Sequence, residues 1–156
     1  MVDTLTEVRR ELADSTDPEN PSAEELRGLF SRVRTIAVVG LSRSPEKPAR
    51  RVPSYLAAKG YDVIPVNPNA DRILGKTAYD RLADVPEPVD LVIVFRPSDQ
   101  AGPFVEEAVA RPDQPAIWLQ SGIRADDEID AARAAGRVAV QDLCAFRVHR
   151  ALFQGA

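Results

Sequence analysis

The chain alternates short apolar runs with longer stretches in which apolar residues recur at every third or fourth position. The short runs are rich in β-branched residues and almost continuously apolar, which is typical of strands buried on both faces of a sheet. The pattern predicts five strands, at 36–39, 61–68, 89–95, 116–119 and 138–140. Because helical patterns separate these strands, we expect a parallel sheet that is covered on both sides.

Right-handed crossovers between such strands predict an α/β fold, a Rossmann-like three-layer sandwich whose five-stranded parallel sheet has the order 3-2-1-4-5. Two helices are expected before the first strand, one over residues 3–14 and one that begins with a capping box of Ser22 and Glu25. We therefore divide a single globular domain into an N-terminal helical extension, 1–32, and a main body, 33–156.

Proline and serine positions set the expected starts of the next helices. Pro53 is unfavourable inside a helix, so the helix after the first strand is expected to begin near Arg50 and to end at Gly60. Ser98 is expected to cap the helix after the third strand. Another helix is expected over 125–135, and a last one near the C-terminus.

Residues 35–48, TIAVVGLSRSPEKP, join a buried strand to a turn and a helix start. Gly40 lies where the backbone has to turn, and Pro48 suits the first turn of a helix. Unpaired N–H groups and the positive end of a helix dipole meet at such a turn, which favours a bound phosphate. Arg43 and Lys47 add positive charge, so this stretch is the candidate ligand site.

The turn lacks the dinucleotide motif G-x-G-x-x-G, because Ser42 and Pro45 occupy the positions of its later glycines. One alternative is therefore a turn that binds nothing. The local charge favours a phosphate site, since the net charge of the chain is −4 and four cations gather here: Arg43, Lys47, Arg50 and Arg51. At least one of the last two is expected on a solvated helix face.

Composition narrows the classes of function. A chain of 156 residues with 44% hydrophobic and 28% charged residues is typical of one soluble globular domain. A pI near 5.1 argues against a nucleic-acid partner. A local basic cluster in an acidic chain instead suits a small anionic ligand.

The single cysteine, Cys144, excludes an internal disulfide and favours a reducing compartment. The N-terminal sequence lacks the apolar run of a signal peptide, and no stretch approaches the ~20 apolar residues of a membrane span. We expect a cytoplasmic protein without a membrane partner. A protein partner or a homodimer is left open.

The end of the second strand bears on the ligand. Sheets that bind NAD place a carboxylate there for the ribose hydroxyls, whereas this strand ends in the neutral Asn67 and Pro68. Asp62 lies at the other end of the strand, and Asp71 lies beyond the proline turn. An adenosine with an extra phosphate is then favoured over NAD, which leaves NADP or coenzyme A (CoA).

Five motifs in order carry a family resemblance: GLSRSPEKP, GYDVIPVNP, PVDLVIVFRP, AIWLQSGI and AGRVAVQDLCAFRVH. The segment from about 33 to 150 resembles the small stand-alone CoA-binding proteins, which are related to the CoA-binding domain of the succinyl-CoA synthetase α subunit. The chain departs from the family pattern at Ala49-Arg50 and at Phe146 and Val148, which leaves the role of the C-terminal segment open.

The resemblance implies a CoA site at the carboxyl ends of the strands. The loop would hold phosphate groups, the second strand the adenosine, the third the sugar and diphosphate, and the fourth would close the groove. The implied contacts are Gly40, Leu41, Ser42, Arg43, Ser44, Lys47, Val66, Asn67, Pro68, Phe95, Arg96, Pro97, Gln120 and Gly122. Trp118 is expected in the core, and Phe95 is balanced between core and contact. Arg96 needs an anionic or hydrogen-bonding partner at the end of a buried strand.

No catalytic constellation is recognisable. Cys144 and the single histidine, His149, are five residues apart and do not share a helix face, so Cys144 is expected to be a buried structural residue. One cysteine and one histidine also make a metal site unlikely. The favoured function is a non-catalytic CoA or acyl-CoA module that acts as a carrier, sensor or accessory. The alternatives are an NADP-binding oxidoreductase or regulator, and an interaction domain that has lost its ligand.

Overall fold

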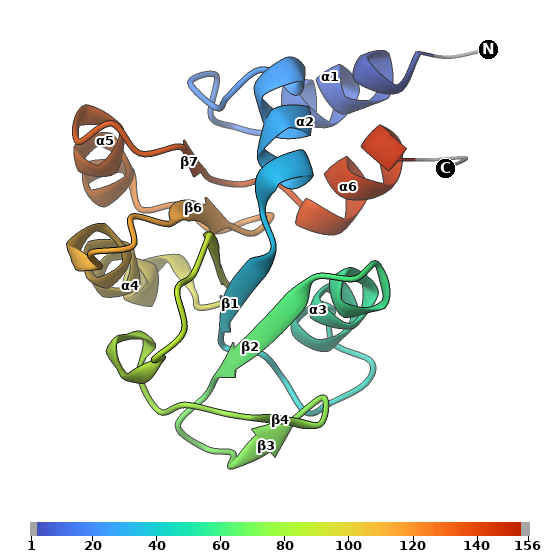
Figure 1. The fold of residues 1–156 in the computed structure, drawn as a ribbon. Coiled ribbons are helices and arrows are strands. Elements are labelled where there is room, and N and C mark those ends of the chain that lie inside the picture. The colour runs from blue at the N-terminus through green and yellow to red at the C-terminus, as the bar shows by residue number, and fades with distance from the viewer. Residues whose placement is uncertain (1–2, 154–156) are drawn as a thin grey trace.

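The computed structural model describes residues 3–153. Residues 1–2 of the predicted extension 1–32 lie outside the described part, as do residues 154–156 of the predicted main body 33–156. Its elements follow one another along the chain in Figure 1. They are α1 (Thr4–Asp14), α2 (Ala23–Arg32), β1 (Thr35–Val39), α3 (Pro48–Ala58), β2 (Asp62–Val66), β3 (Arg72–Ile73), β4 (Lys76–Thr77), the 3₁₀ turn η1 (Leu82–Asp84), β5 (Leu91–Val94), α4 (Ser98–Ala110), β6 (Ala116–Leu119), α5 (Asp126–Ala134), β7 (Ala139–Val140) and α6 (Ala145–Phe153).

Five parallel strands form the central sheet, which confirms the predicted Rossmann-like α/β fold. The strand order is β2-β1-β5-β6-β7, which in the counting of the predicted strands is 2-1-3-4-5. The predicted order 3-2-1-4-5 is therefore wrong in the place of the third strand. That strand, β5, pairs with β1 on the side away from β2, with Ala37 opposite Val92.

The face on which each connection runs explains this order. α3 connects β1 to β2 on one face of the sheet, and its Val52 and Leu56 pack there. The connection from β2 to β5 packs Leu82 and Val85 on the opposite face, with α4 and α5. Right-handed crossovers on opposite faces of a parallel sheet lead the chain in opposite directions across the sheet. The chain therefore returns past β1, and β5 pairs with β1 on the side away from β2.

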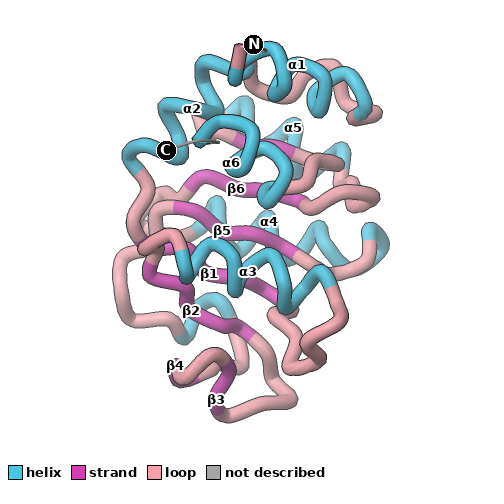
Figure 2. Tube along the Cα trace, turned by 90° about the vertical axis from the view of Figure 1, so that its right-hand side faces the viewer, coloured by secondary structure: helices cyan, strands magenta, loops and turns pink. Residues whose placement is uncertain are grey.

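Two apolar layers enclose the sheet, and alternate strand residues feed each of them. Ile36 and Val38 of β1 face a core formed with α1, α2, α3 and α6, whereas Ala37 and Val39 face a core formed with η1, α4 and α5. Figure 2 shows α3 and α6 in front of the sheet, with α4 and α5 behind it. This arrangement leaves the carboxyl ends of the strands as the edge where loops gather.

The N-terminal helices belong to the first of these cores. The predicted capping box of α2 is present, with Ser22 and Glu25 bonded reciprocally to backbone N–H groups. Leu26 and Phe30 of α2 are buried beside the sheet, and α1 lies along α6 (Figure 1).

Two predicted helix starts need correction. α3 begins at Pro48 rather than near Arg50, so Pro53 lies inside the helix. Ser98 is the first residue of α4 and not its cap, because its hydroxyl accepts a hydrogen bond from the Arg124 N–H at 3.0 Å. Within residues 3–153, every helix is too short or too polar to cross a bilayer.

Candidate functional site

A cavity of about 520 Å³ lies at the carboxyl ends of β1, β2 and β5. We call it the phosphate-loop cavity, after the loop 40–47 between β1 and α3. It lies at the point where the strand order reverses, which is where ligands bind in open α/β sheets. Its lining is formed by Val39, Gly40, Ser42, Arg43, Ser44, Lys47, Ala49, Val66, Asn67, Pro68, Asn69, Asp80, Phe95, Arg96 and Phe104.

Gly40 fixes the start of the loop. Its φ of +83° lies in the left-handed region, and its N–H donates to the Val66 carbonyl at 2.9 Å. A Cβ atom at this position would lie 3.2 Å from the Arg96 Cδ and 3.3 Å from the Phe95 carbonyl oxygen. Glycine therefore allows the end of β5 to close against the end of β1.

Pro53 anchors the middle of the loop from within α3. Because proline has no N–H, the Ala49 carbonyl four residues earlier lacks its helical partner. That carbonyl instead accepts the Ser42 N–H at 3.0 Å. The same proline that predicts a later helix start therefore frees the carbonyl that holds the loop.

Two backbone amides of the cavity remain available to a ligand. Within residues 3–153, neither the Arg43 N–H nor the Ala49 N–H has a hydrogen-bond acceptor. Ala49 belongs to the first turn of α3, where the helix dipole is positive. Arg43 and Lys47 line the same cavity, so amides, dipole and cations all favour an anion there.

Asn67 at the end of β2 has a positioning role. Its Nδ2 donates to the Leu41 carbonyl at 3.0 Å, and its Oδ1 accepts the Asn69 N–H at 2.8 Å. These bonds tie the ends of β1 and β2 together and shape the turn that follows. The polar atoms of Asn67 are thus used within the protein, although the residue lines the cavity.

Asp80 brings a carboxylate to the end of β2 that the sequence did not reveal. Tyr79 pairs beside β2, with its N–H on the Pro65 carbonyl at 3.0 Å and its carbonyl accepting the Asn67 N–H at 2.8 Å. This pairing places Asp80 in the wall of the cavity. Only the folded path of the chain brings Asp80 to this position, since Asp80 lies 14 positions after Val66 in a segment that has only short strands and turns.

Four of the predicted contacts do not line the cavity: Leu41, Pro97, Gln120 and Gly122. The Leu41 side chain is fully buried in the core, and Pro97 lies outside the lining. The Gly122 N–H donates to the Asp142 carboxylate at 2.7 Å. Burial raises the pKa of Asp142, but hydrogen bonds from Thr16 and Gly122 outweigh that effect and hold the pKa below its ordinary value.

A second cavity of about 820 Å³ adjoins the first and shares Lys47, Ala49 and Phe95 with it. It lies between α3, the end of β6 and the start of α6. The residues that line only this cavity are Pro48, Arg51, Val52, Gln120, Ser121, Ile123, Cys144, Phe146 and Arg147. Gln120 is the predicted contact that lies here rather than in the first cavity.

Cys144 differs from its expected place in the core. It is only partly buried, lines the second cavity and precedes α6, where its carbonyl accepts the Val148 N–H at 3.1 Å. Phe146, where the chain departs from the family pattern, also lines this cavity, whereas Val148 is buried in the core. Trp118 is fully buried as expected, with its Nε1 donating to the Leu143 carbonyl at 2.7 Å.

His149 is enclosed away from both cavities by aromatic side chains. Its Nδ1 lies 2.8 Å from the Tyr55 hydroxyl and its Nε2 lies 3.1 Å from the Tyr61 hydroxyl. Since the Tyr61 hydroxyl donates to the Phe30 carbonyl, it must accept from Nε2–H, and Nδ1 then accepts from Tyr55. Burial, followed by the charge of Lys59, lowers the pKa of His149 to about 4.

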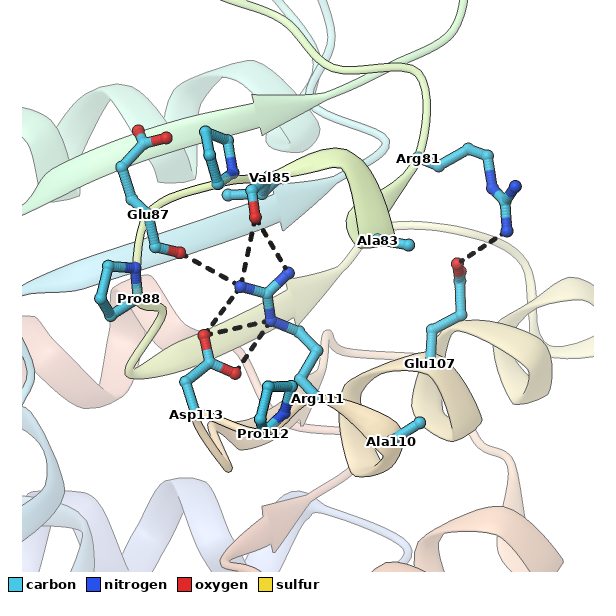
Figure 3. A pocket seen from close by; sticks show the side chains of 11 residues that line it. Arg81, Ala83, Val85, Glu87, Pro88, Glu107, Ala110, Arg111, Pro112 and Asp113 are labelled. Atoms are coloured by element: carbon cyan, nitrogen blue, oxygen red, sulfur yellow. Dashed lines mark hydrogen bonds and ion pairs between the residues drawn. The ribbon is translucent and has the colours of Figure 1, made fainter.

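A third cavity, of about 570 Å³, lies near the start of β5 (Figure 3). The Arg111 guanidinium donates there to the carbonyls of Leu82, Val85 and Glu87, and pairs with Asp113 at 2.7 Å. Because its donors are used within the protein, this arginine is a structural clamp. Among residues 3–153 no group of three or more acidic, histidine or cysteine side chains could hold a metal ion.

The fold and the first cavity together define a Rossmann-like α/β protein with a cavity suited to an anion at the switch point of its sheet. The sequence pattern of the CoA binding domain matches residues 34–150. The chain therefore belongs to the CoA-binding domain family, as the five motifs predicted.

Individual relatives agree with this assignment. The uncharacterized protein YneT of Bacillus subtilis is 37% identical over 126 residues, which cover 81% of this chain and 93% of YneT. A solved structure from Thermus thermophilus is 40% identical, with a TM-score of 0.80 over 85% of this chain and 100% of that one. The acetate–CoA ligase (ADP-forming) II of Archaeoglobus fulgidus is 32% identical over 67% of this chain, which matches only 16% of the ligase.

Proposed function

We propose that the chain binds CoA or a CoA thioester, with phosphate groups of the ligand in the phosphate-loop cavity. The observation that carries this proposal is the convergence of two unpaired amides, the start of α3, and the side chains of Arg43 and Lys47 on one cavity. Backbone N–H groups at a helix start bind phosphate oxygens well, and arginine adds bidentate contacts. The family match explains why the phosphates would be those of CoA.

The module has no catalytic role in this proposal and acts as a carrier, a sensor or an accessory of a larger assembly. Nucleophilic catalysis at Cys144 would require a base beside the thiol. His149 is not free to be that base, because both of its ring nitrogens are bonded to tyrosine hydroxyls. The ligase relative supplies no argument for turnover, since this chain matches only 16% of it.

Asp80 favours a second candidate, an NADP-binding oxidoreductase or regulator. A carboxylate at the end of β2 can accept a hydrogen bond from a ribose hydroxyl, which is the role it has in dinucleotide-binding sheets. CoA also has a free ribose hydroxyl, so Asp80 fits either ligand. Hydride transfer would need a proton donor, and the Tyr55 and Tyr61 hydroxyls are both bonded to His149.

Calorimetric titration of dialysed protein with CoA, dephospho-CoA, NAD and NADP at fixed salt separates these candidates. We expect CoA to bind, dephospho-CoA to bind less tightly, and Arg43→Ala to weaken CoA binding by about tenfold or more. Arg27→Ala removes the same charge from an exposed position on α2 and serves as the control. A ligand at 100 times its Kd should also stabilise the fold by about 2.7 kcal/mol, which a melting curve detects.

Each other result selects against the proposal. Tight binding of NADP or NAD without CoA would favour the oxidoreductase or regulator. Failure of all four ligands to bind would leave an interaction domain whose loop is only a turn. Equal loss of affinity in Arg43→Ala and Arg27→Ala would show that net charge, and not the cavity, attracts the ligand.

A further inference from the structure

The two cavities adjoin each other at Phe95, directly after the end of β5. Lys47, Ala49 and Phe95 belong to the walls of both. A ligand with phosphates in the first cavity can therefore extend past Phe95 into the second. The second cavity reaches the starts of α3 and α6 and the end of β6.

Gln120 presents a hydrogen-bond donor of fixed orientation to the second cavity. The residue is only 4% exposed, and its Oε1 accepts the Ala145 N–H at 2.8 Å. That bond fixes the orientation of the amide and leaves the Nε2 as its free end. Within residues 3–153 the Nε2 has no acceptor, although every side-chain nitrogen or oxygen that is shut off from solvent has a partner. Its N–H groups are therefore accessible from the cavity that Gln120 lines.

The walls around this donor are mostly apolar. Val52 of α3, Ile123 of the loop after β6 and Phe146 of α6 are among the lining residues. The Phe146 ring is held edge-on against Tyr55, with ring centroids 4.7 Å apart. The lining contains no carboxylate that could accept from the Gln120 Nε2, so this donor is available to an oxygen atom of a ligand.

We propose that the second cavity takes the pantetheine arm together with a short acyl group of a CoA thioester, and that Gln120 Nε2 donates to the thioester carbonyl oxygen. This inference rests on the proposed function and names the ligand as acyl-CoA rather than free CoA. A carbonyl oxygen is a strong acceptor, whereas the thiol that ends free CoA is a weak one. The volume of about 820 Å³ is large for a pocket, so a linear arm leaves room for an acyl group.

Three probe ligands test the two cavities separately. Adenosine 3′,5′-bisphosphate can fill only the first cavity, CoA adds the arm, and acetyl-CoA adds a thioester carbonyl. We expect acetyl-CoA to bind about tenfold more tightly than CoA to the natural chain. In the variant Gln120→Glu, the new carboxylate can still accept the Ala145 N–H but has no N–H to donate, so this preference should disappear.

Two further variants complete the design. Gln114→Glu makes the same chemical change at an exposed turn outside both cavities, and it should keep the preference for acetyl-CoA. Ile123→Trp fills the second cavity and should weaken both CoA and acetyl-CoA while adenosine 3′,5′-bisphosphate binds as before. Melting curves of each variant show whether it is folded.

The outcomes separate this proposal from the one on which it rests. If CoA and acetyl-CoA bind equally to the natural chain, the carbonyl contact is overturned while CoA binding stands. If Gln120→Glu keeps the preference, Gln120 does not read the thioester. If adenosine 3′,5′-bisphosphate and CoA both fail to bind, the proposed function itself fails.

Discussion

At the scale of single residues, a few side chains fix the strand ends around the site without offering atoms to a ligand. Asp142, at a φ of +53°, accepts the Gly122 N–H with one carboxylate oxygen and the Thr16 N–H at 2.8 Å with the other. Asn67 connects the ends of β1 and β2 in a similar way. Such residues make the cavity rigid, so that less ordering is needed when a ligand binds.

Gly40→Ala tests how closely the ends of β1 and β5 must approach. Alanine has to adopt a φ of +83° and to place its Cβ 3.2 Å from the Arg96 Cδ. We expect the free energy of unfolding to fall by about 2 kcal/mol in chemical denaturation.

The matched control for that change is Gly60→Ala. Gly60 has a φ of +101°, but nothing lies within 4 Å of the added Cβ. Gly60→Ala should lower the free energy of unfolding only by the cost of the left-handed backbone conformation, about 1 kcal/mol. An equal loss in the two variants would show that the contact with Arg96 and Phe95 has no cost.

At the scale of elements, α3 holds the phosphate loop through an irregularity in its own hydrogen bonding. Pro53 leaves the Ala49 carbonyl to the Ser42 N–H, so the helix and the loop are joined by a bond that a regular helix would not allow. The start of α3 also supplies the Ala49 N–H and the dipole that face the cavity.

Pro53→Ala should therefore separate stability from binding. The new N–H can donate to the Ala49 carbonyl, in competition with Ser42, and the loop should loosen. We expect the CoA Kd to rise about fivefold, which corresponds to part of one hydrogen bond, while the melting temperature stays equal or rises. Calorimetry and thermal denaturation of the same sample measure both quantities.

Pro103→Ala makes the same change inside α4, at an exposed residue that lines neither cavity. It should alter stability without altering the CoA Kd. Unchanged CoA affinity in Pro53→Ala would show that the Ser42 bond does not control the loop.

At the scale of the whole molecule, the sequence predicts what depends on local pattern and misses what depends on the path of the chain in space. The apolar runs and the capping box at Ser22 are local, and the structure confirms them. The strand order depends on the face along which 67–90 returns, which no periodicity reveals. Asp80 and Phe146 reach the cavities through that path and through the packing of α6.

The packing of α6 against α3 also makes the stability of the whole molecule depend on pH. His149 is 4% exposed, and burial together with the charge of Lys59 lowers its pKa from 6.5 to about 4. Between these values the unfolded chain takes up a proton that the folded chain does not. The free energy of unfolding therefore rises as the pH increases from about 4 to 6.5. The full gain, about 3 kcal/mol, is present above pH 6.5.

Urea denaturation at a series of pH values from 4 to 8 measures this dependence, and His149→Gln identifies its source. The amide that replaces the imidazole in that variant can accept from Tyr55 and donate to Tyr61 without titrating, so the rise in stability that His149 causes on the way to pH 6.5 should be absent from the variant. Asp17, Asp113 and Asp142 have pKa values below the ordinary 3.8, so their stabilisation begins to be lost only towards the lowest pH of the series, and it is lost equally in His149→Gln. Since the chain has one histidine, a rise in stability with pH that persists unchanged in His149→Gln would have to come from carboxyl groups whose pKa is lower in the folded than in the unfolded chain.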